Sequence, residues 1–176
     1  MRGLFRVLLL TLLFGLIAPA LAAAPMVGAT APGFRLQDQH GHWREPDQYH
    51  GHWLVMYFYP KDFTPGCTTE VCTFRDDIAK LRRAGADVVG VSLDNVKSHA
   101  DFAAKYHVPF PLLSDADGAV ARRYGVLTGV AGRQYAKRTT FLIDPQGRIA
   151  KVYRDVDPEK NSAQVLADLA ALKATP

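Results

Sequence analysis

Residues 53–59, WLVMYFY, run directly into residues 60–67, PKDFTPGC. Seven apolar and aromatic residues in a row have the length of a β-strand, and a run without polar interruption suits a central strand buried on both faces. The segment that follows ends in Cys67, and the only other cysteine of the chain is Cys72. The pattern predicts a buried strand, a short loop and a helix that carries both thiols.

On either side of this stretch, strand and helix patterns alternate along the chain. We expect further strands over residues 34–38, 43–45, 87–93, 112–113, 139–144 and 148–153, and helices over residues 65–81, 96–106, 118–124 and 163–173. The turn at residues 145–147 should return the last strand antiparallel to the one before it. The order predicts one α/β domain with a central, mostly parallel sheet, flanking helices and an N-terminal hairpin, and it resembles a thioredoxin-like fold.

The first 24 residues differ from the rest in composition. Arg2 and Arg6 precede an apolar run over residues 7–18, and small residues with Ala-x-Ala patterns fill residues 19–24. This is typical of a secretory signal peptide, so we expect a mature domain over residues 25–176 in an exported, periplasmic protein. An uncleaved membrane anchor is the alternative, but the apolar run is short for a span of about 20 residues. After cleavage we expect no stable membrane association.

Charge and histidine content indicate no further ligand. Loss of Arg2 and Arg6 from the 21 basic residues leaves 19 against 17 acidic ones, a balance too mild for a nucleic-acid partner. The motif His-Gly-His-Trp occurs at residues 40–43 and again at 50–53. Two polar turns before strands explain it better than a metal site, since no thiol or carboxylate joins the histidines at ligand spacing. We expect His99 and His107 on the surface, and no metal or organic cofactor.

Cys67 lies where a helix should begin. Thr64 is a favoured N-cap residue and Pro65 a favoured first helical residue, which makes Cys67 the third residue of the helix. Unpaired backbone N–H groups and the positive end of the helix dipole would then surround its sulfur and favour the thiolate. Gly66 leaves room beside the sulfur. On these residues alone, a reactive thiol and a small core residue are both open.

The spacing of the two cysteines bears on that choice. Five residues of α-helix rise about 7.5 Å and place the two Cα atoms roughly 8 to 9 Å apart. A disulfide needs less than about 7 Å, so Cys67 and Cys72 cannot be joined while the helix is intact. An exported protein would ordinarily use two cysteines for an inert crosslink. This pair suits a reducible disulfide that forms when the helix opens.

At residues 59–70, YPKDFTPGCTTE, the chain resembles the active-site signature of peroxiredoxins, and most closely the bacterioferritin-comigratory protein or PrxQ subfamily. Pro60, Thr64 and Cys67 meet the pattern Pro-x-x-x-Thr-x-x-Cys, and Cys72 falls where one branch carries its resolving cysteine. Further matching segments are residues 110–115, 124–126 and 138–144, so the resemblance covers essentially the whole mature chain. The leader is a departure, because most relatives are intracellular.

The resemblance implies a thiol-dependent peroxidase that reduces hydrogen peroxide and organic hydroperoxides. Cys67 would attack the peroxide and become a sulfenic acid, and Cys72 would then form an intramolecular disulfide. Arg138 falls at the position of the catalytic arginine, Thr64 would position the peroxide, and Pro60 would shield the thiolate. A thioredoxin-like or other dithiol protein would restore the thiols. Because both cysteines lie in one chain, we expect a monomer.

Two other functions stay open on the sequence. An exported thiol–disulfide oxidoreductase would share the fold and the compartment, although its usual motif is Cys-x-x-Cys and this chain has four residues between the cysteines. A copper-binding protein of thioredoxin-like fold would need two thiols and a histidine that converge on one ion.

Overall fold

The computed structural model describes residues 24–174, and these contain a seven-stranded sheet of order β2-β1-β5-β4-β3-β8-β9. The strands of this sheet are β1 Leu36–Asp38, β2 Trp43–Arg44, β3 Trp53–Phe58, β4 Ala86–Ser92, β5 Leu112–Ser114, β8 Thr139–Ile143 and β9 Ile149–Arg154. A separate two-stranded hairpin is formed by β6 Leu127–Val130 and β7 Arg133–Ala136. The apolar run at residues 53–59 therefore contains β3, which lies next to the middle strand of the sheet.

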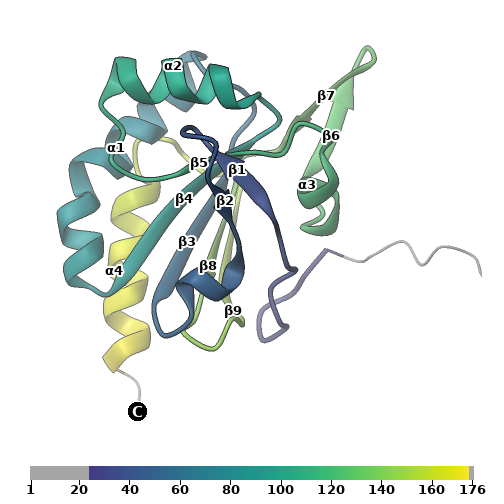
Figure 1. The fold of residues 1–176 in the computed structure, drawn as a ribbon. Helices are drawn as coiled ribbons and strands as arrows, with labels where there is room; N and C mark the ends of the chain where they lie inside the picture. Colours follow the sequence, from purple (N-terminus) through teal and green to yellow (C-terminus); the bar gives the residue numbers. More distant parts are fainter. Residues whose placement is uncertain (1–23, 175–176) are drawn as a thin grey trace, which may run out of the picture.

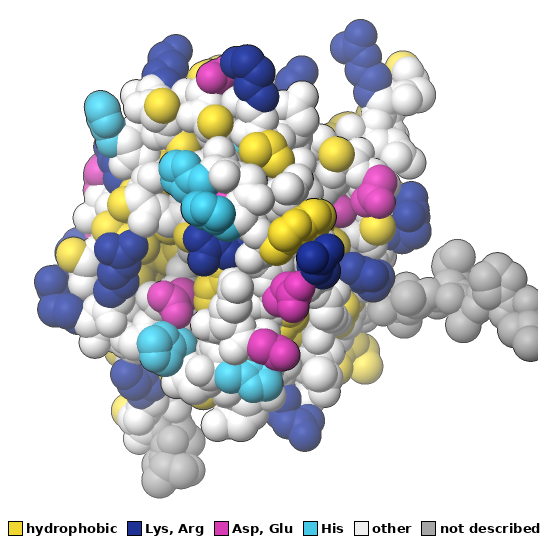
Figure 2. Space-filling model, in the orientation of Figure 1, with side chains coloured by type: hydrophobic (Ala, Val, Ile, Leu, Met, Phe, Trp, Pro, Cys, Tyr) yellow, Lys and Arg dark blue, Asp and Glu magenta, His cyan; other side chains and the backbone are white. Residues whose placement is uncertain are grey.

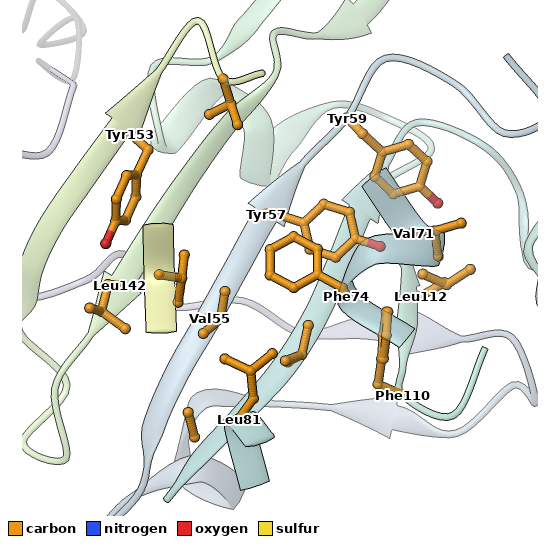
Figure 3. Packing of buried hydrophobic residues seen from close by; sticks show 14 of the residues in the cluster. Val55, Tyr57, Tyr59, Val71, Phe74, Leu81, Phe110, Leu112, Leu142 and Tyr153 are labelled. Atoms are coloured by element: carbon orange, nitrogen blue, oxygen red, sulfur yellow. The ribbon is translucent and has the colours of Figure 1, made fainter. Parts of the chain in front are cut away.

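The helices lie on both faces of the sheet (Figure 1). They are α1 Pro65–Arg83, α2 Val96–Tyr106, α3 Ala119–Arg123 and α4 Asn161–Ala174, with a 3₁₀ turn, η1, over Pro46–Tyr49. One core cluster contains buried residues of α1, α2 and α4, and a second contains buried residues of α3 and the N-terminal segment. Figure 3 shows the first cluster, in which the rings of Tyr57 and Phe74 stack with centroids 4.8 Å apart.

The two clusters explain why β3 is apolar at every position. Val55 and Tyr57 of β3, with Tyr59 just after it, pack into the first cluster, whereas Leu54, Met56 and Phe58 pack into the second. A strand covered on both faces has no side that tolerates polar residues. The thioredoxin-like α/β fold predicted from this pattern is confirmed.

The expected pairing needs a correction, because the sheet is mixed. Parallel pairing is confined to β3–β4 and β4–β5, while β3–β8, β8–β9, β1–β5 and β1–β2 are antiparallel. Burial on both faces produces the same apolar run in either direction, so composition does not reveal strand polarity. The hairpin β6–β7 and η1 were not expected from the sequence.

The surface carries no concentration of one charge on the face shown in Figure 2, where acidic side chains lie among lysines and arginines. Within residues 24–174, no helix combines the length and the apolar character that a membrane crossing requires. The predicted signal peptide, apart from its last residue, lies outside the described residues.

Candidate active site

The loop from Pro60 to Thr64 leads from β3 into α1. Thr64 occupies the N-cap position with extended backbone, and Pro65 is the first helical residue, as predicted. The carbonyl of Thr64 accepts the first helical hydrogen bond from the N–H of Thr68 at 2.9 Å. The Thr64 hydroxyl donates to the carbonyl of Lys61 at 3.0 Å and makes no capping hydrogen bond. It is therefore engaged by the loop backbone and not by the thiol.

Cys67 is the third residue of α1, and its side chain is 1% exposed. The guanidinium of Arg138 approaches it, with Nη2 donating to Sγ at 3.3 Å. The N-terminal position in the helix and a cation in contact with sulfur both favour the thiolate form of a cysteine. Cys67 is thus a buried thiol with a charged partner, and the interpretation as an inert core residue does not fit these contacts.

Arg138 lies in the short connection between β7 and β8, which aims its side chain at the start of α1. Its second partner is the carboxylate of Glu70, one turn of α1 beyond Cys67. Burial alone would disfavour the charged guanidinium, but the charges of Glu70 and Cys67 and hydrogen bonds with both raise the pKa of Arg138 above its usual value. The cation is therefore fixed at the site.

Glu70 is the centre of a buried polar group that the sequence reasoning missed. Its side chain is fully buried, and Asn161 donates to Oε1 at 3.0 Å. The same Asn161 amide donates to the Thr140 hydroxyl at 2.6 Å. Burial raises the pKa of Glu70 to about 7, although Arg138 and Asn161 act in the opposite direction. The spacing of Glu70, three residues after Cys67 and so on the same helix face, is a signal that could have revealed it. Asn161 gave no such signal.

Gly66 has a definite steric role. A Cβ at this position would lie 3.2 Å from Nη2 of Arg138 and 3.7 Å from Cγ of Pro158. The room that the glycine leaves beside the sulfur is thus filled by the arginine, and substitution by a larger residue would push the guanidinium away.

Cys72 is half-buried on the same helix, and both cysteines are free thiols. Helix α1 continues without interruption from Pro65 to Arg83, so the two cysteines are separated by the helical spacing described above. The structure therefore holds the reduced pair in the geometry that forbids a disulfide.

Pro60 lines an open cleft of about 520 Å³ beside the loop. The other lining residues come from the loop, from the end of β4 and from the hairpin, and they are Lys61, Leu93, Asp94, Arg133, Gln134 and Tyr135. The hairpin that the sequence did not predict thus forms one wall of the approach to the Pro60 loop.

The histidines need one correction. His107 is exposed, as expected, but His99 is completely buried and contacts the carboxylate of Asp62 at 2.9 Å. Its helix, α2, turns this residue toward the sheet and the Pro60 loop, and a buried carboxylate supplies the partner that makes a buried imidazole tolerable. The repeated histidines at residues 40, 42, 50 and 52 are all exposed. In the described part of the chain, no three His, Cys, Asp or Glu side chains are arranged to hold a metal ion.

Comparison with known proteins agrees with this geometry. The model of the AhpC/TSA family matches residues 27–152. The chain belongs to the AhpC/TSA family. Peroxiredoxin Bcp of Xanthomonas campestris is 47% identical over 128 residues, which cover 70% of this chain and 78% of that relative.

Solved structures of AhpC/TSA relatives agree as well. The crystal structure of peroxidoxin BcpB from Mycobacterium tuberculosis superposes with a TM-score of 0.79 at 37% identity, covering 84% of this chain and 98% of that one. The bacterioferritin comigratory protein of X. campestris gives a TM-score of 0.75 at 39% identity, covering 86% and 98% of the two chains. That protein was solved as trapped intermediate and ligand complexes to explain its alkyl peroxide reduction activity. Within the AhpC/TSA family the chain is thus a thiol-dependent peroxidase of the Bcp/PrxQ type.

Proposed function

We propose that this chain reduces hydrogen peroxide and alkyl hydroperoxides with the thiolate of Cys67 as the nucleophile. The observation that carries the proposal is the 3.3 Å contact between Nη2 of Arg138 and Sγ of Cys67 at the first turn of α1. The activity named for the X. campestris relative supports the choice of alkyl hydroperoxides as substrates.

In the first step the Cys67 thiolate attacks the terminal oxygen of the hydroperoxide. A sulfur–oxygen bond forms, the O–O bond breaks, and the leaving alkoxide or hydroxide takes a proton from solvent to give an alcohol or water. Sulfur is oxidised to a sulfenic acid, and the peroxide is reduced. Arg138 stabilises the thiolate and then the charge that develops along the O–O bond, because its guanidinium is fixed at the site before reaction.

In the second step the thiolate of Cys72 attacks the sulfur of the Cys67 sulfenic acid. A disulfide forms, and hydroxide leaves and is protonated to water. The first turns of α1 must open for this step, since the helix separates the two cysteines. A thioredoxin-like or other dithiol protein then reduces the disulfide by exchange and is itself oxidised. The chain acts as a monomer in this scheme, because both cysteines belong to one helix.

The two thiols make separate predictions for turnover. Cys67→Ser should abolish consumption of peroxide, because no nucleophile is left beside Arg138. Cys72→Ser should consume one equivalent and then stop, because the sulfenic acid has no internal partner. Peroxide consumption by the full chain measures both, with excess dithiol reductant for the Cys67 variant and without added thiol for the Cys72 variant, because an external thiol can itself reduce a sulfenic acid. Steady turnover by the Cys67 variant would refute the assignment.

The rival thiol–disulfide oxidoreductase function is separated by a second assay on the same protein. Reduction of insulin disulfides without consumption of peroxide would favour the rival. The match to peroxiredoxins over most of the chain supports the peroxidase.

We also propose that residues 1–24 direct export to the periplasm and are removed there. The proposal rests on the basic start, the apolar run and the Ala-x-Ala patterns of the sequence. Sequencing the N-terminus of the protein purified from the periplasmic fraction tests it. A new terminus at or close to Pro25 is expected, and retention of Met1 would contradict the proposal.

A further inference from the structure

A buried polar cluster lies behind the Pro60–Thr64 loop, and the peroxidase mechanism makes no use of it. At its centre, Nδ1 of His99 is 2.9 Å from Oδ2 of Asp62, and the two side chains are 0% and 1% exposed. Tyr59 donates its hydroxyl hydrogen to Oδ1 of Asp62 at 2.8 Å, and Ser98 donates to Oδ2 at 2.7 Å. Three side chains therefore converge on one carboxylate.

The Asp62 carboxyl group receives two hydroxyl donors and has an imidazole nitrogen beside it. The hydroxyls of Tyr59 and Ser98 donate to its two oxygens, and Nδ1 of His99 lies within hydrogen-bond distance. Ser98 and His99 belong to the first turn of α2, which begins at Val96, and the positive end of that helix favours a negative charge there. The cluster thus ties the loop to the N-terminus of α2 by hydrogen bonds.

Among the described residues, the side chain of His99 makes polar contact with this cluster alone. Its Nδ1 lies 3.3 Å from the Tyr59 hydroxyl as well as 2.9 Å from Asp62, whereas Nε2 is buried without a partner in the described part of the chain. A buried nitrogen without a partner costs free energy, so a residue kept only for packing would be better replaced by an apolar one. This indicates a role for the imidazole beyond filling space.

The backbone of the loop is held as firmly as the Asp62 side chain. The N–H of Asp62 donates to Oδ2 of Asp94 at 2.9 Å, and Asp94 also accepts from the hydroxyl of Ser92 at 2.7 Å. The next residue, Phe63, has a φ of 61°, a left-handed conformation that costs a residue with a Cβ about 1–2 kcal/mol. Its ring packs on Phe102 of α2 with centroids 5.0 Å apart. The loop would relax from this strained form if its contacts to α2 were removed.

Asp62 stands midway between Pro60 and Thr64, two residues from each. Anchoring Asp62 therefore restrains Pro60 and Thr64, the two loop residues to which the resemblance to peroxiredoxins assigns roles beside the reacting thiol. We propose that Asp62 and His99 are positioning residues for peroxide reduction, forming a clamp between the loop and α2 that holds Pro60 and Thr64 in place before the peroxide arrives. The inference rests on the proposed function and adds two residues that act through the loop and not on the substrate.

The test follows the two chemical steps separately in the full-length protein. Stopped-flow measurement gives the second-order rate constant for oxidation of Cys67 by hydrogen peroxide and the first-order rate constant for disulfide formation. Asp62→Asn and His99→Leu should lower the first constant about tenfold, because small misplacement of groups around the reacting atom costs about that much or more. Neither should slow disulfide formation, since Cys72 lies beyond the clamp.

Conservative and double variants separate positioning from simple destabilisation. His99→Asn places an amide donor near the position of Nδ1 and should recover most of the lost rate. The double variant Asp62→Asn with His99→Leu should be no slower than the slower single variant, since both changes break one contact. Asp38→Asn is the matched control: Asp38 is 1% exposed and accepts from Arg44 and from the backbone N–H groups of His40 and His42, none of which is a hydrogen-bond partner of Cys67, Asp62 or His99. It should lower the melting temperature and leave the rate constant unchanged.

The outcomes are distinct. Wild-type rate constants in Asp62→Asn and His99→Leu, even with lowered melting temperatures, would overturn the clamp. If those variants do not fold, Ser98→Ala removes one donor and leaves the pair; it should slow peroxide reduction about twofold to threefold, and no change would overturn the proposal. A wild-type protein that consumes no peroxide would instead refute the proposed function.

Discussion

The guanidinium of Arg138 is shared between two acidic groups, the thiol of Cys67 and the carboxylate of Glu70. When both are ionised, one partly buried cation is shared by two anions. When Glu70 is protonated, the charge of Arg138 is left to the thiolate. Burial raises the pKa of Glu70 to about 7, so near neutral pH this carboxyl group is divided between its neutral and ionised forms. When it is ionised, Glu70 competes with the thiol for the charge of Arg138.

The contact distance at Gly66 leads to a prediction for Gly66→Ala. The new methyl group would lie 3.2 Å from Nη2 of Arg138, so the guanidinium must move away from Sγ of Cys67. Alanine is a better helix former by about 1 kcal/mol, so the variant should not lose stability while its peroxide rate constant falls about tenfold or more. Gly33→Ala, where a Cβ meets nothing within 4 Å, is the control. An unchanged rate constant for Gly66→Ala would show that the arginine is not needed at this distance.

A second prediction concerns the free energy of unfolding and pH. The pKa of Glu70 is raised from 4.5 to about 7, so between these values the folded state binds a proton that the unfolded state does not. Stability must therefore fall as pH rises through this window. Glu70→Gln removes the titration, so wild type should lose about 3 kcal/mol relative to this variant between pH 4 and 8. Urea unfolding at several pH values measures it, with exposed Glu159→Gln as control. Parallel pH profiles of wild type and Glu70→Gln would contradict the account.

Among single residues, the sequence identified those that occupy positions of the peroxiredoxin motif. Cys67, Thr64 and Pro60 follow from one segment, Cys72 from its spacing, and Arg138 from the resemblance to peroxiredoxins. Glu70, Asn161 and the Asp62–His99 pair are a different case, because their roles depend on which residues distant in sequence meet in the fold. His99 was wrongly expected on the surface, since an imidazole on an amphipathic helix gives no sign of the carboxylate that will bury it.

Helix α1 is held unevenly along its length. Beyond Cys72, the Arg75 guanidinium donates to the carbonyl of Tyr106 at 2.9 Å, Thr73 donates to the carbonyl of Pro158 at 3.2 Å, and Asp77 accepts from Ser162 at 2.8 Å. Before Cys67, the loop is tied to α2 through Asp62. Between these two ends, Cys67 and Glu70 are held by Arg138 and Asn161, so opening of the turns between Thr64 and Cys72 must break these contacts while the two ends stay in place.

This predicts where oxidation changes the backbone. In the disulfide form, amide hydrogens between Thr64 and Cys72 should exchange faster than in the reduced form, because α1 must unwind there. Amides of β3 and β4 should keep their protection and serve as the internal control. Hydrogen exchange read by mass spectrometry makes the comparison, and equal protection of residues 64–72 in both redox states would count against the opening step.

Among the elements, the sequence predicted those with a strong hydrophobic period and missed those without one. β8 is buried throughout, β3 is buried at every position after Trp53, and α2 was predicted with its observed ends. The hairpin of β6 and β7 is mostly exposed, and its turn places Ala131 and Gly132 at φ of 51° and 78°. Two-residue turns of this kind usually contain Asn-Gly or Asp-Gly, and these sequences allow the turn to be predicted. The Ala-Gly sequence found here does not predict such a turn.

In the whole molecule, the sheet separates two cores, and the site lies at one end of it, where β3 leads into α1. In the proposed cycle both thiols belong to one helix, so one chain contains every residue that the cycle requires before the external reductant. The proposed cycle therefore does not require a second copy of the chain. The oxidised product should accordingly be a single chain with an internal crosslink.

The most direct test is mass spectrometry of the full-length protein after one equivalent of peroxide. Wild type should lose the mass of two hydrogens, run as a single chain without reductant and yield a peptide that links Cys67 to Cys72. Cys72→Ser should gain one oxygen at Cys67, trapped there by a reagent for sulfenic acids. Oxygen found elsewhere, disulfide-linked dimers as the main product, or a Cys67→Ser protein oxidised at the wild-type rate would contradict the account.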